Sequence, residues 1–388
     1  MSQFFDELYE RRKTGAIKWD ALKTIYGTED ILPMWVADMD FSSPPGVQEA
    51  LLNRAQHPIF GYTSLSDKAV EAITDWVLYR HQWKVQHESI LFCPGVVTGI
   101  ATVIQACTEP GDKVMLQSPV YTPFFTMIKN NGREVVNSPL LVENNQFSID
   151  FKVFEDKLKQ GVKLFLLCSP HNPGGRVWTK EELLKIGELC KKYEVTIVSD
   201  EIHADLYFPG HKHVPAASIN PDLENQTITL MAPSKTFNIA GLQASFMVVS
   251  NPELRKKISA VQGAIGFHGL NLFAITALEA AYREGADWLN ELLTYIEENV
   301  RITQAFIETE IPALNVFKPE ASYLVWIDCR TLGHNDKEIQ RLLVEKGKLG
   351  LEPGNKYGQG GEGFVRMNIG CPREVLMDGL NRLKKAFT

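Results

Sequence analysis

Seven short β-rich runs fill the middle of this 388-residue chain, and helical patterns separate many of them. The runs lie at residues 89–92, 113–117, 134–137, 163–168, 196–199, 227–231 and 245–249. Apolar residues at helical spacing lie between them at 97–107, 123–130 and 180–193. Several runs are apolar on both faces, which is typical of strands that helices cover on each side. The alternation predicts an α/β fold with a mostly parallel, seven-stranded type of sheet and ligand sites at the carboxyl ends of its strands.

The length of the chain favours two domains, because a single hydrophobic core rarely grows to this size. Helical patterns dominate from residue 251 to 308, and a smaller α+β unit follows. We expect that unit to contain strands near 314–317, 323–328 and 364–369, a helix near 336–346, a glycine-rich loop at 353–363 and a last helix from Arg373.

The expected domain division has three parts. Residues 1–45 form an N-terminal arm and part of the small domain, 46–285 the large ligand-binding domain, and 286–388 the small C-terminal domain. Within the arm, residues 4–12 predict a short amphipathic helix.

Composition and charge exclude several classes of function. The 44% apolar and 22% charged residues are ordinary for a soluble globular protein, and a net charge of −7 leaves no basic surface for nucleic acid. The first 15 residues lack the apolar run of a signal peptide, and no segment approaches the roughly 20 apolar residues that span a membrane. Six scattered cysteines without a CxxC motif favour reduced thiols in the cytoplasm. No metal site is expected, since His211 and His213 lie on a Pro-Gly loop without a carboxylate partner.

One lysine has surroundings that are unusual for a surface charge. The segment 231–243, MAPSKTFNIAGLQ, follows an apolar strand and places Lys235 after a proline and a serine, near Phe237 and Ile239. The ordinary interpretation of a lysine is a solvated surface charge. Apolar, turn-rich surroundings instead remove water from the ammonium group, which lowers its pKa and makes the amine a nucleophile and a base. Lys235 is therefore the first candidate for a catalytic residue.

Two other segments could bind a phosphorylated, planar ligand. CPGVVTGIA ends a strand and opens a helix, so that Gly95 allows close approach of the backbone. The amides of Val96 and Val97 would then point outward at the positive end of the helix, which suits a phosphate, although a plain turn is the alternative. In QSPVYTPFF, Tyr121 follows a strand where its ring could stack on a cofactor, and a core or rim tyrosine is the alternative.

Polar residues also follow two further strands. In CSPHNPGGRV, a rigid turn presents the amide of Asn172, which could face a phenolate oxygen or only shape the turn. In VSDEIHADLYF, Asp200 ends a strand, where a carboxylate can keep a pyridine nitrogen protonated or cap a helix. His203 could reach the same ring or remain a surface histidine.

An arginine interrupts the last apolar strand. In FVRMNIGCPR, Arg366 lies between apolar neighbours, where a buried charge requires a partner. A substrate carboxylate held by two parallel hydrogen bonds would satisfy it, and an internal ion pair is the alternative.

In combination, these segments resemble fold-type I pyridoxal phosphate (PLP) enzymes, specifically the class I and II aminotransferase family. The motifs NPGG, DEI, SKTFNIAG and VRMNIG occur in that order, and the likeness covers nearly the whole chain. Within the family, the segments PMWVADMDF, FGYTS, SPHNPGGRVW and DEIHADL look like the MalY/PatB branch of cysteine-S-conjugate (cystathionine) β-lyases.

The resemblance implies a role for each candidate residue. Lys235 would bind PLP covalently and move protons, and Tyr121 would act beside it at the cofactor ring. The cofactor-binding set would be Gly95, Val96, Val97, Tyr121, Asn172, Asp200, His203, Ser234 and Lys235, with Tyr62 reaching the phosphate from the neighbouring subunit of a homodimer. The substrate-binding set would be Arg366 for the carboxylate, with Ala37 and Asp38 lining the pocket.

Three positions depart from the aminotransferase pattern. His203 replaces a frequent tyrosine, Gln243 replaces the usual phosphate-binding arginine, and Ala232 replaces the usual serine. The first two changes favour β-elimination from an L-cysteine thioether such as cystathionine, which yields a thiol, pyruvate and ammonia. An aminotransferase of the same fold remains an alternative, as does a protein that acts mainly by contact with a regulatory protein partner.

Overall fold

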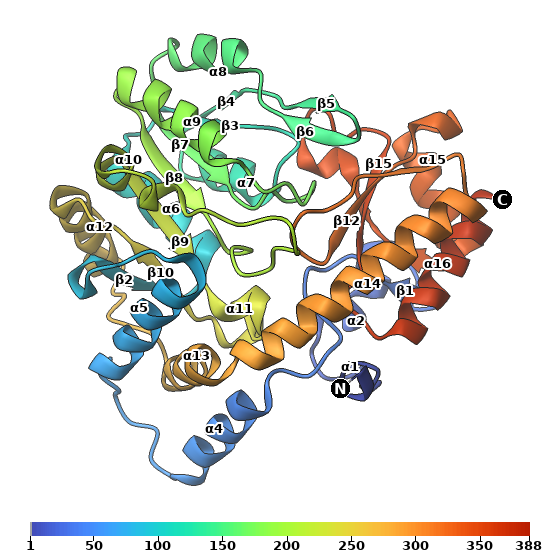
Figure 1. Ribbon diagram of the computed structural model, residues 1–388, viewed down its shortest axis with the longest axis horizontal. Coiled ribbons are helices and arrows are strands. Elements are labelled where there is room, and N and C mark those ends of the chain that lie inside the picture. Colours follow the sequence, from blue (N-terminus) through green and yellow to red (C-terminus); the bar gives the residue numbers. More distant parts are fainter. Residues whose placement is uncertain (1) are drawn as a thin grey trace.

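The computed structural model of the protein describes residues 2–388, and a seven-stranded sheet forms its centre (Figure 1). In sheet order the strands are β2 (Ile90–Cys93), β10 (Ser245–Val248), β9 (Thr227–Met231), β8 (Thr196–Asp200), β7 (Val162–Cys168), β3 (Lys113–Leu116) and β4 (Glu134–Asn137). β10 is antiparallel to both of its neighbours, and the other pairs are parallel. The predicted α/β fold with a mostly parallel sheet is confirmed.

Helices cover both faces of this sheet, because successive side chains of a strand point to opposite faces. On β3, Val114 and Leu116 pack into one core and Met115 into another. The first core contains α6 (Val96–Cys107), α7 (Pro123–Asn130) and α12 (Pro252–Ala264). The second contains α8 (Phe151–Leu158), α9 (Lys180–Lys192) and α10 (Pro221–Gln226). A third core joins α5 (Asp67–His81) and α13 (Leu272–Glu284) to β10, and α4 (Pro45–Gln56) packs on α13.

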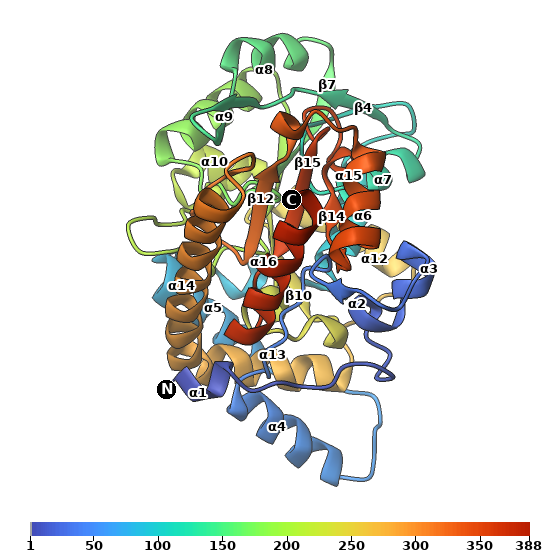
Figure 2. The same ribbon diagram turned by 90° about the vertical axis from the view of Figure 1, so that its right-hand side faces the viewer.

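A smaller unit stands to the right of the large sheet in Figure 1 and faces the viewer in Figure 2. Its antiparallel sheet has the order β11 (Asn315–Val316), β12 (Leu324–Asp328), β15 (Phe364–Asn368) and β14 (Glu352–Pro353). Its helical elements are α14 (Ala286–Glu310), α15 (Asp336–Arg341), the π-helical turn η5 (Leu342–Gly347) and α16 (Arg373–Phe387). From the arm, β1 (Leu32–Pro33) pairs in parallel with β13 (Leu349–Gly350). We propose that the arm and residues 286–388 form one small domain beside residues 46–285, and the pairing of β1 with β13 supports this division. Met1, which the expected arm includes, lies outside the described residues.

The helix expected at residues 4–12 is wrong, since α1 (Ser2–Phe5) ends at Phe5. Downstream, Arg11 forms ion pairs with Asp38 at 2.9 Å and with Asp40 at 2.6 Å. Because these carboxylates lie on a distant segment, the apolar spacing within residues 4–12 could not reveal the ion pairs. The arm continues through α2 (Ile17–Asp20) and α3 (Leu22–Tyr26).

The remaining elements are short. They are the hairpin β5 (Leu141–Glu143) and β6 (Gln146–Ser148), α11 (Pro233–Thr236), and the 3-10 turns η1 (His87–Ser89), η2 (Ala216–Ser218), η3 (Ala240–Leu242), η4 (Arg330–Leu332) and η6 (Gly354–Tyr357). Among the described residues, none of the helices is both long enough and apolar enough to cross a lipid bilayer.

Candidate active site

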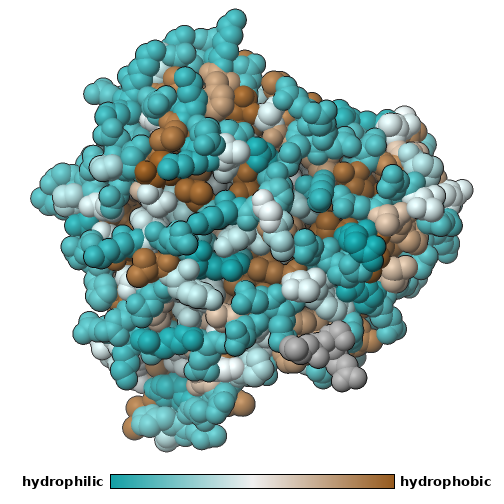
Figure 3. All heavy atoms as spheres, in the orientation of Figure 1, coloured by the Kyte–Doolittle hydropathy of each residue, from teal (hydrophilic) through white to brown (hydrophobic). Residues whose placement is uncertain are grey.

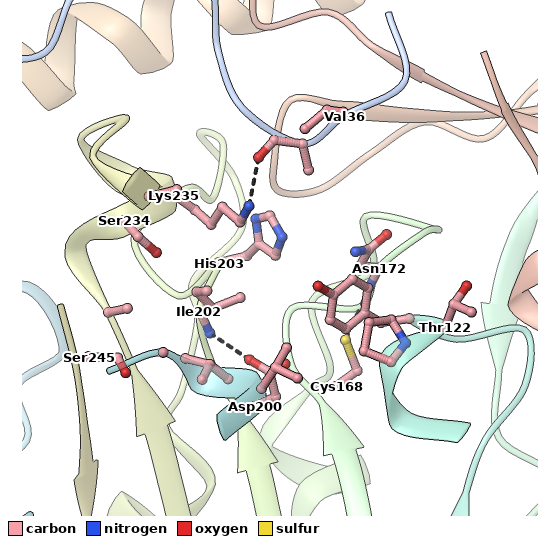
Figure 4. Close-up of a pocket in the computed structure, with 18 of the residues that line it drawn as sticks. Val36, Thr122, Cys168, Asn172, Asp200, Ile202, His203, Ser234, Lys235 and Ser245 are labelled. Atoms are coloured by element: carbon pink, nitrogen blue, oxygen red, sulfur yellow. Dashed lines mark hydrogen bonds between the residues drawn. The ribbon is translucent and has the colours of Figure 1, made fainter. Parts of the chain in front are cut away.

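A cavity of about 500 Å³ lies at the carboxyl ends of β7, β8 and β9, where they meet the arm and the small unit. The large unit contributes to its lining Pro94–Thr98, Tyr121–Pro123, Cys168, Asn172, Asp200, Ile202, His203, Ala232, Ser234, Lys235, Ala240 and Gln243–Ser245. The arm contributes Trp35–Ala37, and the small unit contributes Glu352, Tyr357 and Arg366. Figure 4 shows Lys235 and Asn172 on opposite sides of this cavity, with Asp200 at a strand end below them.

Lys235 enters the cavity from α11, the single turn that follows β9. Its Nζ donates a hydrogen bond to the carbonyl oxygen of Ala37 at 2.7 Å. Loss of water around the ammonium lowers the pKa of Lys235 to about 8, and the positive charge of Arg366 acts in the same direction. The carboxylates of Asp38 and Asp200 oppose this shift. At neutral pH a substantial fraction of the amine is therefore unprotonated and able to act as a nucleophile.

Asp200 is the last residue of β8 and is buried. Its Oδ1 accepts a hydrogen bond from the backbone of Ile202 at 3.1 Å, and within the described part of the chain it forms no ion pair. Burial raises the pKa of Asp200 to about 7. A buried carboxyl without a cation beside it is costly in its charged form, so the cavity is suited to a ligand that brings a positive group to this point.

His203 lies beside Lys235 in the same cavity (Figure 4). Burial, together with the nearby charges of Lys235 and Arg366, lowers the pKa of His203 to about 3, so the imidazole is neutral. Its Nδ1 lies 3.3 Å from the hydroxyl of Ser322. His203 is thus a neutral polar group at the wall of the cavity and cannot supply a fixed positive charge.

Arg366 reaches the cavity from the centre of β15 and is buried. One guanidinium nitrogen donates to Asn172 Oδ1 at 3.1 Å, and the other donates to the carbonyl oxygen of Trp35 at 2.7 Å. The guanidinium also stands over the ring of Tyr357, 5.5 Å from its centroid. Its Nε is buried and has no hydrogen-bond partner, and no carboxylate pairs with Arg366 within the described residues. An anionic ligand would therefore find an unpaired positive charge here.

The start of α6 closes the other end of the cavity. Gly95 precedes this 12-residue helix with an extended φ of 171°, and a Cβ added there would meet nothing within 4 Å. The first turn holds no acidic residue and no side chain caps it, so its amides face the cavity with a positive helix end. Ser234 and Gln243 line the cavity as well. The backbone here can hold a phosphate, with a glutamine in the position where an arginine is usual.

Two of the predicted site residues do not line the cavity. Tyr62 is fully exposed and lies outside the cavity of its own chain. Asp38 follows the cavity-lining Ala37, but its carboxylate pairs with Arg11 at 2.9 Å and lies near Lys18 at 3.8 Å. The other predicted site residues all line the cavity.

The lining residues that were not singled out from the sequence include Trp35, Glu352 and Tyr357. Trp35 belongs to the PMWVADMDF segment, whose resemblance to the family could have pointed to it. Glu352 and Tyr357 flank the start of the glycine-rich loop, where β14 and η6 form and Tyr357 is buried. Nothing in their local spacing distinguishes them from surface residues.

These groups fit PLP. The open cradle at Gly95 suits its phosphate, the unpaired carboxyl of Asp200 suits its protonated ring nitrogen, and the desolvated amine of Lys235 suits its aldehyde. Fold and site together therefore define a fold-type I PLP enzyme.

Comparison with known proteins identifies the family to which the chain belongs and relatives within it. Residues 29–383 match the family model for aminotransferase class I and II, and the chain belongs to this PLP-dependent family. It is 51% identical to cystathionine β-lyase PatB of Bacillus subtilis over 99% of this chain and 100% of that one. It is 34% identical to protein MalY of Escherichia coli over 99% and 98% of the two chains. Its fold matches the PLP-bound C-S lyase from Staphylococcus hominis with a TM-score of 0.91 and 33% identity, covering 99% and 98% of the chains. The resemblance to the MalY/PatB branch is confirmed.

Proposed function

We propose that the protein is a PLP-dependent carbon–sulfur β-lyase that cleaves L-cystathionine and related L-cysteine S-conjugates. The observation that carries the proposal is the desolvated Lys235 amine in one cavity with the unpaired groups of Asp200 and Arg366. The similarity to cystathionine β-lyase PatB and to a PLP-bound C-S lyase supports this chemistry over transamination.

The roles of the residues follow from their positions. Lys235 would hold PLP covalently, with Asp200 at the ring nitrogen, Asn172 at the ring oxygen, Tyr121 against the ring, and the amides of Val96 and Val97 with Ser234 at the phosphate. His203 lies beside Lys235 as a neutral cavity wall, and Ala37 fixes Nζ through its carbonyl oxygen. When bound, PLP supplies an electron sink that stabilises negative charge at the substrate Cα.

Arg366 would hold the substrate α-carboxylate through charge-assisted hydrogen bonds, which orients the Cα–H bond toward Lys235. The neutral Nζ of Lys235 can then take the Cα proton. The Cβ–S bond breaks, and the thiolate leaves readily because an ordinary thiol has a pKa of about 8.5. In sum, the conjugate and one water give a thiol, pyruvate and ammonium; with L-cystathionine the thiol is homocysteine.

The test is an assay with L-cystathionine as the sole substrate. We expect the purified holoenzyme to release pyruvate and homocysteine in equal amounts without any added keto-acid acceptor. A Lys235→Ala variant should release neither, while an unchanged rate in that variant would contradict the role of the lysine. Turnover that requires an added keto acid would identify an aminotransferase instead.

We also propose that the active enzyme is a homodimer in which Tyr62 of each subunit reaches the phosphate of the other. Ile59, Phe60 and Tyr62 are exposed on the segment after α4, which projects from the molecule in Figure 1. Figure 3 shows isolated hydrophobic side chains among mostly hydrophilic ones at the tip that this region forms. Burial of such a group in a subunit contact is favourable. If Tyr62→Ala retains PLP on dialysis as well as the wild type does, the shared site is refuted.

The six cysteines all carry free thiols, and five of them are buried. We propose that the protein works in the reducing cytoplasm, which the free thiols support.

A further inference from the structure

A charged pair links the wall of the cavity to a second, separate depression, which Lys356 lines. Glu352 lines the cavity, and its Oε1 accepts a hydrogen bond from Lys356 Nζ at 2.9 Å. The side chain of Glu352 is 14% exposed and that of Lys356 is 46% exposed, so Lys356 is the more solvent-accessible member of the pair. Among the described lining residues the other carboxylate is Asp200, which is buried at the floor.

The register of the small sheet places this pair next to the carboxylate site. Glu352 on β14 lies directly opposite Arg366 on β15 in an antiparallel pair. Side chains of directly opposed residues project from the same face, with their Cβ atoms about 4.5–5.5 Å apart. Thr122 Oγ1 donates to the carbonyl oxygen of Lys356 at 2.8 Å and so ties the segment to the start of α7. A substrate held by Arg366 would therefore lie beside Glu352, which carries Lys356 as its hydrogen-bond partner.

We propose that Glu352 and Lys356 form a binding subsite for the far end of the S-substituent. The subsite selects L-cysteine conjugates whose S-substituent ends in both an ammonium and a carboxylate group. Glu352 accepts hydrogen bonds from that ammonium, and Lys356 donates to that carboxylate. This inference rests on the proposed C–S lyase function and assigns the residues that select among its substrates.

Both partners keep the hydrogen-bonding capacity that the subsite requires. Glu352 Oε2 has no protein partner within the described residues, and Lys356 Nζ makes a single hydrogen bond although an ammonium carries three donors. The subsite also reduces a charge repulsion within the cavity. Lys235 and Arg366 are the cationic side chains that line the cavity, and a second ammonium group on a substrate would be repelled by both of them. Glu352 offsets this repulsion at the cavity wall.

The experiment compares conjugates that differ only in the charge at the far end. L-Cystathionine carries both charges, S-(3-aminopropyl)-L-cysteine the cation, S-(3-carboxypropyl)-L-cysteine the anion, and S-butyl-L-cysteine neither. For Glu352→Gln we expect the ratio of kcat/KM for cystathionine to that for the butyl conjugate to fall about tenfold, mainly through KM, because a polar site loses its preference when its partner group is neutralised. For Lys356→Gln the fall should be about threefold, because this side chain is more exposed.

The singly charged conjugates separate the two halves of the subsite. Glu352→Gln should weaken selection of the aminopropyl conjugate, and Lys356→Gln that of the carboxypropyl conjugate. Glu310→Gln is the matched control, since Glu310 pairs with Lys384 at 2.5 Å on α14 and α16, away from the cavity. Equal losses for all four conjugates, or unchanged ratios, would overturn the subsite. If the wild type cleaves none of the four conjugates, the proposed function fails. In that case the subsite is tested by calorimetric binding of the same conjugates to the same holoenzyme variants, with ratios of affinity in place of ratios of kcat/KM.

Discussion

The reactivity of the Lys235 amine should follow its own titration well below the range of an ordinary lysine. Desolvation lowers the pKa of Lys235 to about 8, so that about one-tenth of the amine is neutral at pH 7. An ordinary lysine with a pKa of about 10.4 is only about 0.04% neutral at that pH. The cavity therefore raises the reactive fraction of Lys235 about 200-fold at neutral pH.

Competitive acylation of the apo protein measures this titration at the residue itself. Acetic anhydride is added in trace amounts between pH 6 and pH 11 together with a small amine of known pKa, and acylation of Lys235 is quantified by mass spectrometry. We expect the acylation rate of Lys235 to rise to a plateau with a midpoint near pH 8. The rate at which the apo protein captures PLP, followed by absorbance, should show the same midpoint.

A variant at Arg366 tests the direction in which its charge shifts the pKa of Lys235. The positive charge of Arg366 contributes to the lowered pKa of Lys235, so Arg366→Met should move the midpoint upward. Ionic strength should change this difference little, since both groups lie within the cavity. A midpoint near pH 10.4 in the wild-type protein would show that the amine is fully hydrated, and the desolvation argument would fail.

Three further predictions follow from other contacts. Arg366→Gln should raise KM for S-alkyl-L-cysteine conjugates about tenfold to a hundredfold, because a hydrogen bond to a charged group contributes about 1.5–3 kcal/mol; steady-state kinetics with an unchanged KM would mean that the arginine is only structural. Gln243→Arg should slow the loss of PLP on dialysis, since a fixed positive charge would join the α6 amides at the phosphate end, and faster loss would contradict that placement. Asp205→Asn should lower the free energy of unfolding by about 3 kcal/mol, because buried Asp205 accepts hydrogen bonds from Trp76, His81 and Thr236. Burial alone would raise the pKa of Asp205, but His81 and Arg80 hold this pKa below its ordinary value. The stability that Asp205 contributes is therefore present above about pH 4 and is lost as the pH falls further. Urea unfolding of the wild type and the variant from pH 7 to pH 3 measures this contribution, and an equal pH slope in the two proteins would refute it.

Much of the fold could be predicted from local sequence. The strands of the large sheet appeared as apolar runs, and α6, α7 and α9 begin and end within one residue of the expected helices. Lys235, Asp200 and Asn172 could also be predicted, because each lies at or shortly after the carboxyl end of a strand, and these ends share one edge of the sheet. Such signals are local: they depend on side-chain periodicity and on turns within about ten residues.

What local sequence could not show is which distant segments complete the site. Arg11 lies outside any helix and pairs with Asp38 and Asp40, and Lys235 finds its hydrogen-bond acceptor in Ala37, 198 residues away along the chain. Glu352 enters the cavity only because β14 pairs with β15 in the register that sets it opposite Arg366. Hydrogen bonds and charges act over a few ångströms in space, whatever the separation in sequence, so these contacts exist only once the arm and the small unit have packed against the large sheet.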